Sequence, residues 1–150
     1  MTFIVPSSAL ADEGLIRLKS AYSVTQTLDR FEQSVKSKGM TIFARIDHAE
    51  GAEAVGKVLR PTALLIFGNP KVGTLLMQSN QTAGIDLPLK LLAWQDAEGQ
   101  VWIAYNDPQW IAQRHGIKDR AAVVAKMRKA MAGFAAAARG ADGPENNADN

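Results

Sequence analysis

Apolar and polar positions along the chain recur in patterns that predict short strands and amphipathic helices. Residues 14–20 alternate between apolar and polar side chains and end in polar residues, as a half-buried strand does. A helix is then predicted from Ser23, whose hydroxyl can cap the first turn. Apolar residues follow from Val24 to Val35 at helical spacing, and Gly39 can take the left-handed stop.

The middle of the chain predicts two strands joined by a weak helix. Met40–His48 alternates, with Ile42, Ala44 and Ile46 on one predicted face. The small residues that follow tolerate one or two helical turns. Residues 62–67 are continuously apolar, as a central strand covered on both faces would be.

The second half of the chain adds a hairpin and three helices. Asn69-Pro70 predicts the start of a short helix over residues 72–77, and residues 80–88 are expected to form a loop. The hairpin and the two later helices have these expected bounds: strands Leu89–Gln95 and Gln100–Asn106, a helix from Pro108 to Arg114, and a helix from about residue 119 to 138. The whole order predicts an α+β fold with one mostly antiparallel sheet and helices packed on one face.

Composition excludes several classes of site. The 150 residues fit one domain, and 47% hydrophobic with 21% charged residues is ordinary for a globular chain. The chain has no cysteine, which excludes thiol catalysis, disulfides and cysteine-based metal sites. A net charge of +2 does not predict nucleic-acid binding, and no apolar run approaches the ~20 residues needed to cross a bilayer.

The two ends of the chain are expected to be poorly ordered. Residues 1–13 read as a leader without a basic n-region or a full apolar h-region, which favours a cytoplasmic protein. Ala9-Leu10-Ala11 has the small-x-small pattern of a signal-peptidase site, so a periplasmic location stays an alternative. Residues 140–150 are polar and glycine-containing, and they predict a disordered tail.

Two motifs carry a resemblance to a known family. The pattern F-x-x-I-D-H spans Phe43–His48, and L-x-I-F-G-N-P-x-x-G-T spans Leu64–Thr74. With these motifs, residues 14–117 resemble the bacterial and archaeal domain of unknown function 302. The resemblance implies a TATA-binding-protein-like β-α-β(4)-α fold, often dimeric, with no settled activity. The family's recurrent polar positions correspond to Asp47, His48, Arg60, Gly68, Asn69, Pro70 and Asn106. The leader and the helix over residues 118–139 depart from the simple family domain.

The Gly68–Thr74 turn allows two interpretations. It matches G-x-x-x-x-G-T but lacks the lysine that a P-loop places before its Ser or Thr, so nucleotide triphosphate hydrolysis is not predicted. Free N–H groups at the helix start, with Lys71 nearby, can hold a carboxylate or phosphate. The alternative is a capped strand-to-helix turn with no ligand.

The histidines do not predict a metal site. His48 follows Asp47 at the end of a strand and can act as a general base, a ligand contact or a structural residue. His115 lies at a helix C-terminus, where the helix dipole gives it a structural role. The two histidines have neither H-x-x-x-H nor H-x-H spacing, so no metal or cofactor is expected. A G-x-S-x-G elbow is absent, and pairing Asp47 with Asp86 or Asp107 has no support in the sequence.

The last predicted helix is amphipathic. Its apolar stripe includes Val123, Met127 and Phe134, and Arg120, Lys126, Arg128 and Lys129 lie on the opposite side. The stripe is rich in alanine and lacks tryptophan, which favours packing on its own domain or a dimer mate over binding to a membrane. The basic side is then interpreted as solvated.

These patterns predict a small homodimeric binding module for a polar or anionic ligand, with a pocket between the sheet and the Asn69 helix. The expected walls are Phe43, Phe67, Leu76 and Trp94. The expected ligand-binding residues are His48, Asn69, Lys71, Asn106, Asp47 and Arg60. One alternative is a hydrolase- or isomerase-like enzyme that uses His48 as acid/base with the Asn69 turn as anion holder. Another is an interaction protein that docks a partner through its basic last helix.

Overall fold

The computed structural model describes residues 14–140, so the expected leader and residues 141–150 of the expected tail lie outside the described residues. Its elements are β1 (Leu15–Ser20), α2 (Val24–Ser37), β2 (Thr41–Asp47), α3 (His48–Ala54), β3 (Thr62–Gly68), α4 (Pro70–Ser79), the 3-10 helix η1 (Gln81–Ile85), β4 (Leu89–Gln95), β5 (Val101–Asn106), α5 (Pro108–Arg114) and α6 (Ala121–Arg139). This order confirms the predicted strands and helices and adds η1.

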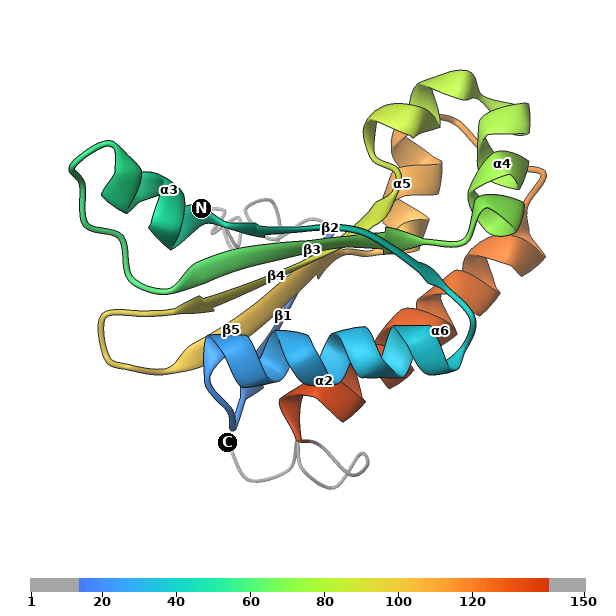
Figure 1. The fold of residues 1–150 in the computed structure, drawn as a ribbon. Helices are drawn as coiled ribbons and strands as arrows, with labels where there is room; N and C mark the ends of the chain where they lie inside the picture. The colour runs from blue at the N-terminus through green and yellow to red at the C-terminus, as the bar shows by residue number, and fades with distance from the viewer. Residues whose placement is uncertain (1–13, 141–150) are drawn as a thin grey trace, which may run out of the picture.

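The five strands form one sheet in the order β1-β5-β4-β3-β2 (Figure 1). Every neighbouring pair is antiparallel. The β4–β5 hairpin closes where Asp96 accepts hydrogen bonds from the backbone N–H groups of Glu98 and Gln100. Gly99 takes a φ of 85° in the same turn, a conformation that glycine adopts without strain. The predicted α+β class with an antiparallel sheet is confirmed.

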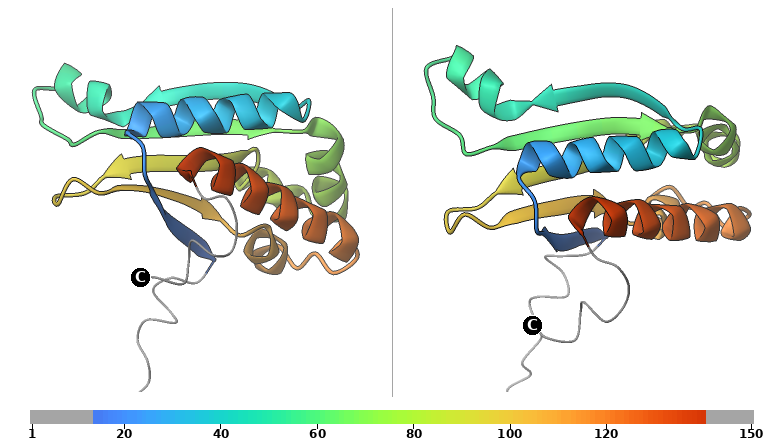
Figure 2. Two further views of the ribbon diagram at one scale, coloured as in Figure 1. Left: turned by 90° about the horizontal axis from the view of Figure 1, so that it is seen from below. Right: turned by 60° about the horizontal axis from the view of Figure 1, so that its bottom comes forward.

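Helices α2 and α6 lie side by side on one face of the sheet (Figures 1 and 2). Phe31 of α2 is fully buried at their junction with the sheet. Its ring meets the ring of Phe67 on β3 edge-on at 5.0 Å, and that of Phe134 on α6 at 6.0 Å. These rings join three elements in one core, which confirms that helices pack on one face.

The opposite face of the sheet, called here the open face, has no helix of residues 14–140 across it (Figure 1). Helix α3 stands at one end of this face, and α4, η1 and α5 stand at the other. The register pairs Leu64 with Leu92 and Trp94 with Trp102 on this face. The two indole rings stack at 6.4 Å. An apolar sheet surface therefore stays partly exposed in the single chain.

A β-bulge in β2 changes the predicted faces of that strand. Alternation placed Ile42 and Ala44 on one face, but the register shifts between them. Ile42 lies opposite buried Phe67, whereas Ala44 lies opposite Ile66, whose side chain points to the other face. That expectation was wrong because one extra residue in a strand inverts the faces beyond it. The inserted residue, Phe43, is 50% exposed.

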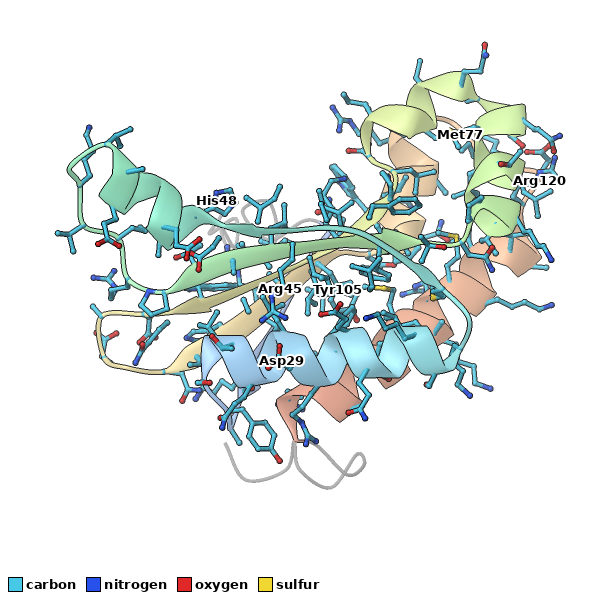
Figure 3. The ribbon with its side chains drawn as sticks, in the orientation of Figure 1. Asp29, Arg45, His48, Met77, Tyr105 and Arg120 are labelled. Atoms are coloured by element: carbon cyan, nitrogen blue, oxygen red, sulfur yellow. The ribbon has the colours of Figure 1, made fainter. Side chains whose placement is uncertain are left out.

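Beyond the bulge, β2 is attached to α2 by an ion-pair network. Arg45 donates to Asp29 at 2.6 Å and to Glu32 at 3.3 Å, both on α2 (Figure 3). Arg45 therefore points toward the helices, and its partner in the sheet is Leu65 of the covered face. This contact fixes which face of the edge strand meets the core.

Helix α6 contributes its apolar stripe to the same core. Its buried residues are Val124, Met127, Met131, Phe134, Ala135 and Ala138. Arg30 of α2 donates to the carbonyl of Ala137 at 2.8 Å, and Arg139 donates to the carbonyl of Lys19 at 2.7 Å. The helix packs on its own domain, which is one of the two arrangements that its alanine-rich stripe predicted.

Candidate functional site

A cavity of about 810 Å³ lies at the end of the sheet where β3 passes into α4. It is bounded by the end of α2, by Phe43 at the β2 bulge, by α4, by residues 87–89 and by α6. Its walls are mostly apolar, and its position agrees with the pocket expected beside the Gly68–Thr74 turn. These are the dimensions and composition of a small-molecule site.

The expected wall residues divide between the cavity and other places. Phe43 lines the cavity, and its ring lies 3.6 Å from the position that a Cβ on Gly68 would take. Phe67 and Leu76 are fully buried in the core instead. Trp94 stacks on Trp102 on the open face. Their apolar character was evident from the sequence, but the direction of each side chain depends on strand register.

The Asn69 turn is a helix cap whose N–H groups are already bonded. Asn69 Oδ1 accepts a hydrogen bond from the Lys71 N–H at 3.0 Å. The Asn69 carbonyl accepts from the N–H groups of Val72 and Gly73, both at 2.9 Å. Pro70 has no N–H. The first turn of α4 therefore has no free N–H donors for an anion. This geometry matches the second interpretation of the Gly68–Thr74 turn, a capped strand-to-helix turn without a ligand.

Asp47, His48 and Arg60 lie at the other end of the sheet from Asn69. Asp47 pairs with Ala63 at the start of β3, and His48 begins α3 (Figure 3). Asp47 caps α3 by accepting from the Glu50 N–H at 3.0 Å. His48 and Arg60 are exposed. His48 and the Asn69 turn consequently do not share a site, which corrects the expectation that they act on one ligand.

Lys71 and Asn106 are at the same end as the cavity but do not line it. Lys71 is exposed on the first turn of α4. Asn106 is exposed at the end of β5, opposite Leu15 of β1. Of the six expected ligand-binding residues, Asn69 alone lines the cavity.

Lysines from two helices line the cavity, and sequence analysis missed them as site residues. They are Lys38 after α2 and Lys126 and Lys129 on α6. The basic side of α6 was the available signal, but it was interpreted as solvated. In the structure Arg120 donates to Ser79 at 3.0 Å and Arg128 to Asp107 at 2.9 Å, so these two arginines have protein partners.

A second polar cluster joins η1 to α5. His115 Nε2 lies 2.6 Å from Asp86 Oδ2, and His115 Nδ1 lies 2.8 Å from the Thr82 hydroxyl. Asn80 Nδ2 donates to the His115 carbonyl at 2.7 Å, and Arg114 also binds Asp86. The imidazole is 7% exposed and does not line the cavity. The cluster therefore connects structural elements, in keeping with the structural role predicted for His115.

Asp107 and Asp96 have structural partners as well. Asp107 caps α5 and binds Arg128, so neither it nor Asp86 faces Asp47. The Trp102 indole N–H lies 2.8 Å from Asp96 and holds the pKa of that carboxyl below its ordinary value. Burial raises the pKa of the Tyr105 hydroxyl on the covered face. Neither of these two groups lines the cavity.

Within residues 14–140, no cluster of histidine and carboxylate side chains is arranged to hold a metal ion. Over the same residues, no helix combines the length and the apolar character that crossing a membrane requires.

Comparison with known proteins finds relatives and a shared fold. The chain is 48% identical over 112 residues to proteins named fluoride-specific ion channel FluC 1 of Brucella suis and FluC 2 of Brucella melitensis. The match covers 75% of this chain but 44% and 42% of those proteins, so the chain spans less than half their length. The name describes those whole proteins.

A crystal structure of an uncharacterized conserved protein from Bacillus stearothermophilus has the same fold, with a TM-score of 0.74. The two chains are 22% identical, and the match covers 84% of this chain and 98% of the other. A family model, described as the domain of unknown function DUF302, matches residues 16–134, a range that takes in most of α6. The chain belongs to the family of the domain of unknown function DUF302.

Proposed function

We propose that this chain is a small-ligand-binding domain whose ligand occupies the cavity between α2, α4 and α6. The observation that carries the proposal is the cavity itself, about 810 Å³ in volume, with mostly apolar walls and a few polar groups. Sites for small molecules range from ~300 to ~1,000 Å³ and have this composition. Asn69 and Thr74 are polar groups of the wall that can orient a ligand.

One glycine in the cavity wall, Gly133, supports the proposal. Gly133 lies inside α6, where glycine costs about 1 kcal/mol relative to alanine. A Cβ at this position would meet no atom within 4 Å, so packing does not require the glycine. The missing side chain instead leaves space beside the cavity that Gly133 lines. A ligand that uses this space would account for a glycine in an otherwise alanine-rich helix.

Filling that space tests the proposal. Gly133→Leu should project a side chain toward the cavity while raising helix propensity, so the variant should fold and lose ligand binding. Gly51→Leu is the matched control, because Gly51 is also helical and also has nothing within 4 Å of its Cβ position, but belongs to α3. Binding is measured with the neutral dye Nile red, and native mass spectrometry detects any molecule retained from the source.

The proposal requires wild type and Gly51→Leu to bind the dye and Gly133→Leu to bind it much more weakly. Equal binding by both variants would place the ligand elsewhere. Absence of both dye binding and retained mass in wild type would remove the proposed function altogether. Circular dichroism of each variant checks that the fold is kept.

We also propose that the domain forms a homodimer through the open face. Ile46 on this face is 40% exposed, and Leu64, Leu92 and Trp94 beside it are half-buried. Near α3, Val58 is fully exposed. An apolar surface of this extent is typical of an interaction site, and a second copy would cover it with the same surface.

Charge placed on the open face tests the dimer. Leu92→Lys should convert a dimer to a monomer in light scattering after size exclusion, because a lysine in an apolar interface loses its hydration. Ala122→Lys adds the same charge at an exposed position on α6 and should leave the mass unchanged. A wild-type protein that stays monomeric at all concentrations contradicts the dimer proposal.

The alternatives raised by the sequence have less support. An enzyme that combines His48 with the Asn69 turn would need residues from opposite ends of the sheet. Docking through the last helix would have to use its basic side, because its apolar stripe is buried, and Arg120 and Arg128 on that side already have protein partners. The channel activity named for the Brucella relatives belongs to proteins of which this chain matches less than half, so it is not proposed here.

A further inference from the structure

The cavity walls are apolar and adaptable. Every methionine of residues 14–140 lines the cavity, and these are Met40, Met77, Met127 and Met131. They come from the segment before β2, from α4 and from α6, so three separate parts of the chain supply them. Methionine is unbranched and polarizable, and it adapts its shape to apolar partners. Such walls suit the flexible apolar body of a ligand and disfavour a fully polar one, which would lose its hydration there.

Charge in the cavity has one sign. Lys38, Lys126 and Lys129 line it, and no aspartate or glutamate does so in the described part of the chain. All three lysines are exposed, and none forms an ion pair with another residue of the range 14–140. Lys126 and Lys129 are three residues apart on α6, so their side chains project from the same side of the helix. Lysine stems can lie along the apolar wall while the ammonium groups stay at its margin.

The helix start of α4 does not compete for the anion. Its first-turn N–H groups donate to Asn69 or are missing at Pro70. The charge that a ligand meets is therefore that of the lysines. Lys38 is far from Lys126 and Lys129 along the chain, so the sequence alone does not group the three. Apolar walls and a cationic margin together fit a molecule with an apolar body and an anionic head.

We infer that the cavity binds a single-chain amphipathic anion, with its apolar chain among the methionines and its carboxylate or phosphate head at Lys38, Lys126 and Lys129. This inference rests on the proposed function and specifies its ligand class. The occupant is a free amphiphile, because the apolar groups line a hollow bounded by helices on both sides. A bilayer surface would instead require apolar side chains on a protruding face.

The test compares ligands that differ in the head group alone. Decanoate, decyl phosphate, 1-decanol and decyltrimethylammonium compete with Nile red for the full chain, each below its micelle concentration. Both anions should bind about tenfold more tightly than the alcohol, from ion pairs with exposed lysines. The cation should bind more weakly than the alcohol. A stronger response to one anion identifies whether the head is a carboxylate or a phosphate.

Two double variants locate the charge that acts. Lys126→Met/Lys129→Met keeps the apolar stems and should lower the preference for anions over decanol to about threefold or less. Lys57→Met/Lys118→Met removes the same charge from exposed positions that do not line the cavity, and it should keep the full preference.

Equal binding of anion and alcohol to wild type would overturn the inference while leaving the proposed function intact. So would a preference that survives in Lys126→Met/Lys129→Met, or binding to phosphatidylglycerol vesicles without binding to the free anions. Failure of all four compounds and of the dye to bind would instead overturn the proposed function.

Discussion

Phe134→Ala tests whether α6 is part of the core. The Phe134 side chain is 5% exposed, and its ring meets that of Phe31 edge-on at 6.0 Å and an interplanar angle of 74°. Truncating a buried phenylalanine to alanine costs about 3–5 kcal/mol. Of this, the ring pair with Phe31 accounts for ~0.5–1.5 kcal/mol beyond area burial. Against a total stability of ~5–15 kcal/mol, the variant should fold with much less margin.

Urea denaturation followed by circular dichroism measures this loss. With a slope of ~2 kcal/mol per M, the midpoint should fall by about 1.5–2.5 M. Ala132→Ser, at an exposed position of the same helix, should change stability by no more than ~0.5 kcal/mol. Combining Phe134→Leu with Phe31→Leu in a double-mutant cycle isolates the ring pair. A loss below ~1 kcal/mol for Phe134→Ala would refute the packing of α6 described above.

The same packing changes what truncation is expected to do. If the last helix were an appended docking element, removing all residues after Ile117 would leave the domain folded. Helix α6 instead buries Met131 and Phe134 against α2 and the sheet. Its removal would expose that surface, so the truncated chain should unfold.

Further substitutions test individual contacts. Asp86→Asn should lower the free energy of unfolding by about 1.5–3 kcal/mol, because it weakens a 2.6 Å contact with the nearly buried His115. Thermal denaturation measures this loss, and unchanged stability would mean that the contact does not contribute in solution. Asn69→Ala should cost ~0.5–2 kcal/mol through loss of the α4 cap, whereas Asn69→Asp should retain it, and equal losses would contradict the capping role. The Trp102 indole holds the pKa of the folded-state Asp96 carboxyl below 3.8, its ordinary value. The ionised carboxylate therefore stabilises the fold above pH 3.8, and this stabilisation is lost as the pH falls through the folded-state pKa. Asp96→Asn should therefore lose less stability than wild type between about pH 6 and pH 2 in urea titrations; parallel curves would count against this contact.

Much of the fold follows from local signals in the sequence. Ser23 and Gln26 form a capping box at the start of α2, and Asp107-Pro108 starts α5, as their residue types predict. The β2 bulge at Phe43 could not be predicted, because the strand alternates without any turn residue to mark the insertion. The segment that forms η1 was expected to be a loop. It is a short 3-10 helix that starts where Asn80 accepts a hydrogen bond from the Thr82 N–H, and a single short turn of this kind leaves no periodic pattern in the sequence.

The candidate site was harder to predict than the fold, because its residues come from distant parts of the chain. Asn69 was recognised from a local motif, but Lys38 follows α2 whereas Lys126 and Lys129 lie on α6, so tertiary packing brings these lysines to one cavity. The grouping of His48 with Asn69 was wrong for a reason that topology supplies. His48 follows the last residue of β2, and Asn69 follows the last residue of β3. These strands are antiparallel neighbours, so their C-terminal ends lie at opposite ends of the sheet.

The cavity and the open face are spatially separate, so ligand binding and dimer formation should respond to different substitutions. Helices α2 and α6 border the cavity and cover one face of the sheet, whereas Leu92 belongs to the other face. Gly133→Leu should therefore weaken Nile red binding without changing the molecular mass, and Leu92→Lys should change the mass without weakening binding. Substitutions at sites with no shared contacts usually act independently. If Leu92→Lys also abolished binding, the second copy would have to complete the ligand site, and the cavity of the single chain would be insufficient to bind the ligand.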